Sequence, residues 1–125
     1  MRIDVVTIFP QMFQGIFEVG VVGKASQKGL LKFSFHNLRD YTTDRHQTVD
    51  DTPFGGGGGL VFKLEPLTRA LRAIQDPQLK SRSVLLSPRG RVLNAVTARS
   101  YAAFDQLILF CGRYEGVDER FCDYV

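Results

Sequence analysis

Two short glycine-containing loops carry residue types that could build a small-molecule site. Ser87-Pro88-Arg89-Gly90 stands at the end of a strand predicted around Val84, and Gly112-Arg113-Tyr114-Glu115-Gly116 follows the apolar segment 107–111. In each loop glycine lets a ligand approach the backbone, and N–H groups are available to hold it. The spacing matches neither the dinucleotide fingerprint nor the P-loop. The pair favours a small polar ligand, with ordinary tight turns as the alternative.

A third region combines charged side chains with a run of glycines. Residues 44–54 include Arg45, His46 and Asp50, and Gly55 to Gly59 follow directly. Carboxylates and an imidazole can act as acceptors, donors or general bases. Bare glycine backbone suits a flat pocket wall for a planar group, but glycine runs are also common in flexible linkers. A pocket wall and a solvated loop are therefore both open interpretations.

The elements that position these loops alternate between strands and helices. Strands are predicted over 2–9, 31–37, 84–87 and 106–111, and helices from Pro10 through Phe17, over 21–28, over 66–74 and from Asn94 to Phe104. This order predicts an α/β domain with a mainly parallel sheet flanked by helices. Both glycine loops then leave the carboxyl edge of the sheet, where ligands bind. His36 lies on the polar face of its strand, so we interpret it as a surface histidine without a role.

Composition excludes several classes of protein. The 125 residues fit one compact domain, and 44% apolar with 23% charged residues excludes intrinsic disorder. No apolar run approaches the ~20 residues that span a bilayer, and no signal pattern precedes the first strand, so we expect no membrane association and a cytoplasmic protein. Cys111 and Cys122 fit neither a metal site nor a disulfide framework, which indicates inert thiols.

Positive charge is unevenly distributed. The net charge is +3, yet the stretch from Lys63 to Arg99 holds eight basic and two acidic residues. Such a bias permits a polyanionic partner on one face, although a solvated helix face explains it equally.

Several longer motifs resemble one family. They are Ile8 to Phe13, Arg39-Asp40-Tyr41-Thr42, Asp44 to Asp51, Gly55-Gly56-Gly57, Leu86-Ser87-Pro88 and Cys111 to Arg120. In this order they resemble the bacterial tRNA (guanine-N1)-methyltransferase (TrmD) family over the whole chain. The resemblance implies the SPOUT-type α/β fold with a trefoil knot. It implies methyl transfer from S-adenosylmethionine to N1 of the guanosine 3′-adjacent to the anticodon in tRNA, by a homodimer with its active site at the subunit interface.

The resemblance also assigns residues. It implies a methyl-donor pocket lined by Leu85, Leu86, Ser87, Pro88, Gly90, Gly112, Tyr114, Glu115 and Gly116. It implies that the guanosine is received by Arg45, His46, Asp50, Gly57, Gly58 and Gly59. Glu115 is expected to support catalysis, and the resemblance assigns no metal ligand, leaving a need for Mg2+ open. Leu85 replaces the usual tyrosine and Arg89 the usual glutamine, so backbone contacts are expected to survive at both positions, whereas a ring contact at Leu85 is lost.

The family's chain continues past the position of Val125. The resemblance therefore implies that residues 1–125 form an S-adenosylmethionine-binding catalytic domain cut short before the knot is completed, without the family's C-terminal tRNA-binding domain. The main general base is expected beyond Val125, so we expect this chain alone to be inactive. A non-catalytic nucleotide- or RNA-binding α/β module and an inactive fragment of the enzyme are the alternatives.

Overall fold

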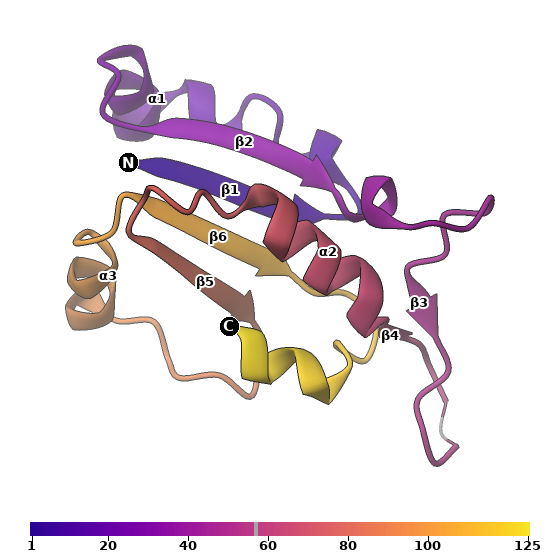
Figure 1. Cartoon of the computed structure of the whole chain (residues 1–125). Helices are drawn as coiled ribbons and strands as arrows, with labels where there is room; N and C mark the ends of the chain where they lie inside the picture. Colours follow the sequence, from indigo (N-terminus) through magenta and orange to yellow (C-terminus); the bar gives the residue numbers. More distant parts are fainter. Residues whose placement is uncertain (57) are drawn as a thin grey trace.

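The computed structural model describes residues 1–56 and 58–125 and contains a four-stranded, all-parallel sheet. Its strands, in spatial order, are β2 (Lys32–Asn37), β1 (Arg2–Thr7), β6 (Gln106–Cys111) and β5 (Ser81–Leu86). A separate antiparallel pair consists of β3 (Asp50–Asp51) and β4 (Val61–Phe62). The α-helices are α1 (Gly20–Gln27), α2 (Leu64–Ile74) and α3 (Ala95–Tyr101). The predicted α/β fold with a mainly parallel sheet is confirmed (Figure 1).

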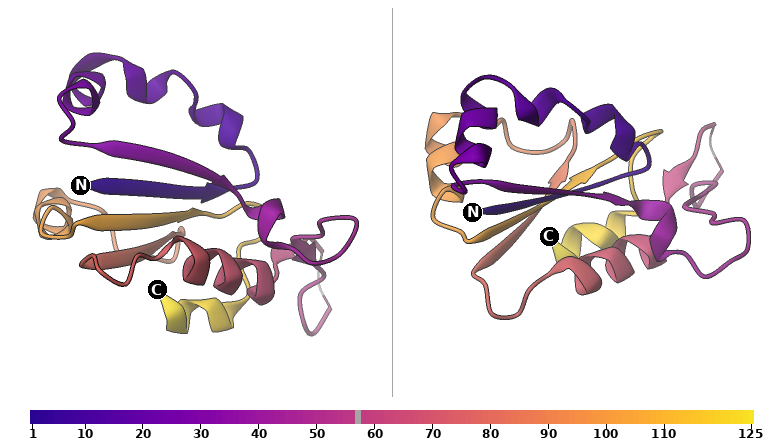
Figure 2. Two further views of the ribbon diagram at one scale, coloured as in Figure 1. Left: turned by 45° about the horizontal axis from the view of Figure 1, so that its top comes forward. Right: turned by 90° about the horizontal axis from the view of Figure 1, so that it is seen from above.

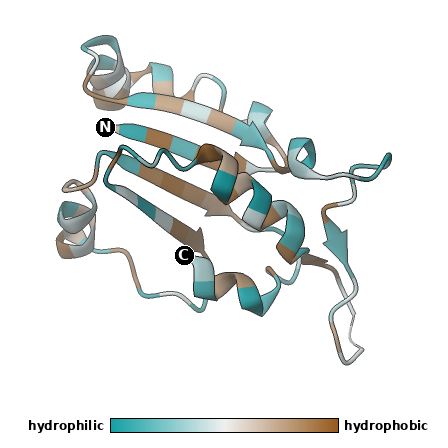
Figure 3. Ribbon diagram, in the orientation of Figure 1, coloured by the Kyte–Doolittle hydropathy of each residue, from teal (hydrophilic) through white to brown (hydrophobic). Residues whose placement is uncertain are grey.

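Helices cover both faces of the sheet. Figure 2 shows α2 and the C-terminal 3₁₀ helix (Glu119–Tyr124) on one face, and α1 with the 3₁₀ turns that precede it on the other. The strands β1 and β6 lie in the middle of the sheet, and β6 is apolar along most of its length, whereas apolar and hydrophilic residues alternate in the first part of β1 (Figure 3). Burial on both faces explains the nearly continuous apolar run of β6.

The main core lies between the sheet and α2. The residues that α2 contributes to this core recur at the spacing of one helical face, and Leu67, Ala70 and Ile74 among them are all buried. Phe110 of β6 packs edge-to-face against Phe121, with ring centroids 4.8 Å apart. Each large apolar side chain removed from water in this way stabilises the fold by about 1.5–3 kcal/mol. The core therefore fixes β6, and with it the loop that leaves the end of β6.

Helix boundaries differ slightly from the predicted ones. The helix α2 begins at Leu64 rather than Pro66, and α3 ends at Tyr101 rather than Phe104. The predicted cap is confirmed, because the Asn94 side chain accepts a hydrogen bond of 2.9 Å from the Thr97 N–H. In the part of the chain that the structure describes, no helix has the length and apolarity to cross a membrane.

The predicted helix from Pro10 through Phe17 is wrong. The segment forms two 3₁₀ turns, Pro10–Phe13 and Ile16–Glu18, separated by Gly15 in the left-handed region at φ +82°. A left-handed residue ends helical hydrogen bonding. Met12 and Ile16, which a helix would place on one apolar face, are 65% and 62% exposed.

The interpretation of His36 as a surface histidine without a role is also wrong. Asp4 is fully buried in β1, and its carboxylate lies 2.8 Å from His36 Nε2. Gln106 Nε2 donates to the same carboxylate at 2.8 Å, and Arg2 Nε pairs with it at 2.8 Å. Burial raises the pKa of Asp4, but hydrogen bonds from His36, Gln106 and Arg2 outweigh burial and hold the pKa below its ordinary value. His36 therefore belongs to a polar network inside the sheet.

Candidate functional site

The two glycine loops line one cavity, as the sequence predicted. The cavity has a volume of about 770 Å³ and lies where β5 and β6 end, at the carboxyl edge of the sheet. Pockets for small ligands typically measure roughly 300–1,000 Å³. The residues lining it from the end of β5 and from these loops include Leu85, Leu86, Ser87, Pro88, Arg89, Gly90, Gly112, Arg113, Tyr114, Glu115 and Gly116. All nine residues that the resemblance assigns to the donor are in this set.

The loop after β5 is a tight turn built by its own serine. Ser87 Oγ accepts from the Arg89 N–H at 3.2 Å, and the Ser87 carbonyl accepts from the Gly90 N–H at 3.0 Å. A Cβ at Gly90 would lie 3.2 Å from that carbonyl oxygen, so the turn leaves little room for a side chain. Leu86 directly before the turn is 51% exposed, whereas Leu85 packs against the core. The turn thus offers the cavity an apolar surface beside polar backbone.

The loop after β6 holds a non-glycine residue in a strained conformation. Tyr114 adopts φ +60°, in the left-handed region, and its ring packs edge-to-face on Phe62 at 5.6 Å. Strain of this kind persists where surrounding contacts enforce it, and it is frequent at ligand sites. Within residues 1–56 and 58–125, the N–H groups of Arg113 and Tyr114 donate to no other group. They are therefore available to a ligand in the cavity.

Backbone hydrogen bonds attach the residues that directly follow the glycine run to the loop after β6. The Glu115 N–H donates to the Leu60 carbonyl at 3.0 Å, and the Phe62 N–H donates to the Gly116 carbonyl at 3.0 Å. Gly59 touches the Glu115 side chain so closely that a Cβ at Gly59, which has φ +99°, would collide with Glu115 Cγ. These contacts place Glu115 at the junction of the two segments.

The described residues among those expected to receive guanosine do not line the cavity. Arg45 and His46 are exposed in the loop before β3, and half-buried Asp50 belongs to β3. None of them lines the cavity, Gly58 is exposed, and Gly57 lies outside the described residues. Of the segment expected to receive guanosine, the structure therefore brings Gly59 into contact with the Glu115 loop.

The Asp44 side chain organises this outer loop. Its carboxylate accepts from the Thr48 hydroxyl at 2.7 Å and from the Thr48 N–H at 3.1 Å. The hydrogen bond from the Thr48 side chain, followed by the one from its backbone, holds the pKa of Asp44 below its ordinary value. Asp44 is thus a structural residue of the loop that carries Arg45 and His46.

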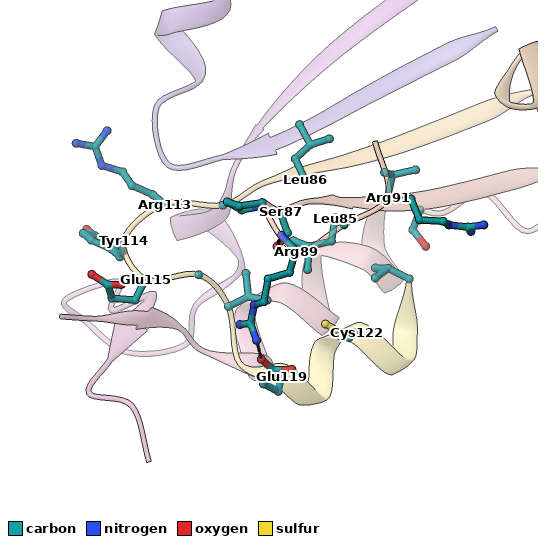
Figure 4. A pocket seen from close by; sticks show the side chains of 18 of the residues that line it. Leu85, Leu86, Ser87, Arg89, Arg91, Arg113, Tyr114, Glu115, Glu119 and Cys122 are labelled. Carbon is teal, nitrogen blue, oxygen red and sulfur yellow. Dashed lines mark hydrogen bonds and ion pairs between the residues drawn. The ribbon is translucent and has the colours of Figure 1, made fainter. Parts of the chain in front are cut away.

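Positive side chains line the cavity, and Arg89 is one that forms an ion pair. Figure 4 shows the Arg89 guanidinium directed at Glu119, with which it forms an ion pair across the cavity. Both side chains are largely exposed, so the pair contributes little to stability. It nevertheless connects the loop after β5 to the C-terminal 3₁₀ helix. Arg89 therefore has a defined partner here.

Sequence reasoning missed cavity residues that come from distant elements. Arg82 lies on β5, Tyr101 ends α3, and Cys122 lies on the C-terminal 3₁₀ helix, yet all three line the cavity. Alternation along β5 could have indicated the face on which Arg82 lies. No local pattern indicates the other two, because their positions depend on how α3 and the 3₁₀ helix pack.

Comparisons with known proteins identify relatives over the whole chain. The family model described as "tRNA (Guanine-1)-methyltransferase TrmD" matches residues 1–125. A tRNA (guanine-N(1)-)-methyltransferase of Heliobacterium modesticaldum is 50% identical over 125 residues, covering 96% of this chain and 46% of the relative. One of Dictyoglomus turgidum is 51% identical over 120 residues, covering 96% and 48%.

A solved structure shares the fold. The crystal structure of tRNA (m1G37) methyltransferase from Aquifex aeolicus aligns with a TM-score of 0.90 and 34% sequence identity. The alignment covers 100% of this chain and 56% of that one. The chain spans about half the length of the curated relatives that it matches.

Proposed function

Since this chain belongs to the tRNA (guanine-1)-methyltransferase family, we propose that it is the methyl-donor-binding part of an enzyme that methylates tRNA. The family is the one that the motifs around His46 and Tyr114 resemble, so that prediction is confirmed. The proposed reaction transfers a methyl group from S-adenosylmethionine to N1 of the guanosine 3′-adjacent to the anticodon. We assign residues 1–125 to the catalytic domain.

The cavity at the ends of β5 and β6 is the proposed donor site. It combines the apolar surface of Leu86 with the available N–H groups of Arg113 and Tyr114, which suits a nucleoside with a polar edge and an apolar face. A Cβ at Gly112 would lie 3.7 Å from the nearest atom, the Leu86 carbonyl oxygen. The backbone at Gly112 is therefore open to a ligand. When bound, S-adenosylmethionine would supply an electrophilic methyl group.

The chemistry requires positioning and removal of one proton. Methyl transfer to a ring nitrogen is an in-line displacement, so holding acceptor and donor in line supplies much of the rate. The N1 proton must leave before or during attack, which requires a base. We propose that Glu115, held against Gly59, supports the acceptor rather than removing that proton. Asp50 and His46, with Arg45 and the glycines, would contact the guanosine or its neighbours.

The remaining parts of the proposal follow from the family. A base in a single-stranded loop is extruded at low cost, which suits a guanosine beside the anticodon. Basic side chains between Lys63 and Arg99 would bind phosphates and make RNA binding salt-dependent. We further propose that the enzyme is a cytoplasmic homodimer with its active site at the subunit interface and with the knotted SPOUT topology. Chelation of Mg2+ would test whether the reaction depends on this ion.

One observation carries the proposal: both glycine loops, far apart in the sequence, line the same cavity. The test is a titration of the isotope-labelled chain with S-adenosylmethionine, followed by the amide NMR signals, which also detect weak binding. We expect shifts confined to 86–90 and 112–117. No shifts at saturating donor, or shifts elsewhere, would contradict the donor site.

Gly112→Val provides the matching loss of function. The new side chain projects where the ligand would approach, while the fold has room for it, so we expect donor binding to fall by at least tenfold with an unchanged Tm. Ala73→Val, at an exposed position of α2, is the control and should bind like the wild type. Unchanged affinity for the Gly112 variant in calorimetry would show that the donor lies elsewhere.

A further inference from the structure

A second cluster of charge lies beside the donor cavity, around the ring of Phe9. The Arg39 guanidinium carbon lies 5.8 Å from the centroid of this ring, and that of Arg113 lies 4.8 Å from it. The two side chains come from segments far apart in the chain, namely the 3₁₀ turn after β2 and the loop after β6. Both distances lie within the roughly 6 Å over which a cation is attracted to an aromatic face.

Arg39 is held firmly in this position. Its Nη1 donates to the Ile8 carbonyl at 2.7 Å, and its backbone N–H donates to Asn37 Oδ1 at 3.1 Å. The Thr42 hydroxyl donates to the Arg39 carbonyl at 2.7 Å. A side chain ordered before binding loses less conformational entropy when a ligand arrives. The guanidinium is therefore prepared to bind without rearrangement.

The two positive charges are close together and lack acidic partners. The two guanidinium carbons can be no farther apart than the sum of their distances to the ring centroid. This upper limit is close to the Debye length of about 10 Å at 0.1 M salt. In the described ranges 1–56 and 58–125, neither arginine forms an ion pair with a carboxylate, including neighbouring Asp40. Two like charges gathered without a counter-charge favour an anion between or beside them.

We propose that Arg39 and Arg113, supported by Phe9, bind a backbone phosphate of the RNA substrate. Guanidinium groups suit phosphate because their N–H groups form two parallel, charge-assisted hydrogen bonds with its oxygens. The identity of the polyanion rests on the function proposed above. The site itself rests on the geometry around Phe9.

The position of the cluster favours an RNA phosphate over the carboxylate of the methyl donor. Neither Phe9 nor Arg39 lines the donor cavity within the described residues. In Figure 4, Arg113 extends away from the Glu115 and Glu119 side chains. The anion therefore binds outside the cavity, yet on the loop that lines it.

The test compares the salt dependence of RNA binding between Arg39→Gln and the wild type. The probe is an RNA hairpin with an anticodon stem and loop, and its Kd is measured by fluorescence anisotropy between about 50 and 200 mM salt. The control is Lys28→Gln, which also removes one exposed positive charge but lies between α1 and β2, at the end of the sheet where β2 begins. Arg113→Gln is a second variant, should Arg39→Gln fail to fold.

We expect Arg39→Gln to weaken RNA binding roughly tenfold at low salt, the loss for one charge-assisted hydrogen bond. The slope of log K against log salt should fall by about 0.7–0.9, whereas Lys28→Gln should change neither the affinity nor the slope. A slope equal to that of the wild type would overturn the phosphate site while leaving the proposed function intact. Weaker S-adenosylmethionine binding by Arg39→Gln, with RNA binding unchanged, would reassign the cluster to the donor carboxylate. If the wild-type chain did not bind RNA, the inference would be overturned. The proposed donor site would still be tested separately, by the NMR titration with S-adenosylmethionine.

Discussion

The buried carboxylate of Asp4 allows a quantitative prediction about stability. The variant Asp4→Asn keeps the size of the side chain but replaces one of its two acceptor oxygens with an NH2 group. Each oxygen accepts two contacts, Oδ1 from His36 and Arg2 and Oδ2 from Gln106 and Arg2. In either orientation of the amide, one pair of donors would therefore face another donor.

The size of the effect follows from which donors can be rehydrated. Arg2 is one-third exposed and can turn towards water, whereas Gln106 is fully buried. Hydrogen bonds to a charged group contribute about 1.5–3 kcal/mol each, and a buried donor left unsatisfied costs a further 1–3 kcal/mol. Since Arg2 offsets part of the loss, we expect Asp4→Asn to lower the free energy of unfolding by about 3 kcal/mol near pH 7.

The pH dependence of the difference provides an independent check. The pKa of Asp4 is lowered in the folded protein, so its carboxylate stabilises the fold fully above the unfolded pKa, about 3.9. This contribution is lost as the pH falls through the lower pKa of the folded state. The wild type should therefore lose its advantage over the variant only below about pH 4.

Urea denaturation followed by circular dichroism measures both effects. A loss of about 3 kcal/mol corresponds to a midpoint lower by roughly 1–3 M urea for a domain of this size. The control is Asp123→Asn, an exposed carboxylate that should change stability by less than about 0.5 kcal/mol. An Asp4 variant as stable as this control, or a difference that persists unchanged into acid, would refute the reasoning.

Two further predictions concern the site. Gly59→Ala should push Glu115 from its position and destabilise the fold by about 1–2 kcal/mol, because the new Cβ would collide with Glu115 Cγ and because the backbone at Gly59 has φ +99°. Gly58→Ala, with open space around it, is the control in the same urea assay. Equal denaturation midpoints for the two variants would show that the contact is unimportant. Exposed Cys122 should react with a thiol reagent before Cys111, since burial raises the pKa of the Cys111 thiol. Mass spectrometry of the labelled peptides measures the order of reaction, and labelling of Cys111 first would contradict the prediction.

Local patterns predicted much of the fold. The apolar run 107–111 and the amphipathic repeat in 66–74 identified β6 and α2, and the helix cap at Asn94 was found from residue type alone. The two glycine loops were expected at one edge because parallel strands end on the same side. These inferences succeed because periodicity and capping depend on residues close together in the sequence.

Other predictions failed where the decisive contact came from elsewhere. The apolar pattern through Met12 and Ile16 predicts a helix, but the left-handed backbone at Gly15 interrupts it. His36 occupies a polar position of its strand, yet it pairs with Asp4, 32 residues away. Alternation says which side of a strand a residue faces, but it does not say what covers that side.

The sequence by itself determined the α/β class, the order of most elements, the family and the loops that form the cavity. The tertiary structure decided which distant groups meet: Gln106 with Asp4 across 102 residues, Gly59 with Glu115, and Arg39 with Arg113 around Phe9. Periodicity is a property of neighbouring residues, whereas these contacts depend on strand register and on how separate elements pack. Charge and shape at the site therefore emerge only when the chain is folded.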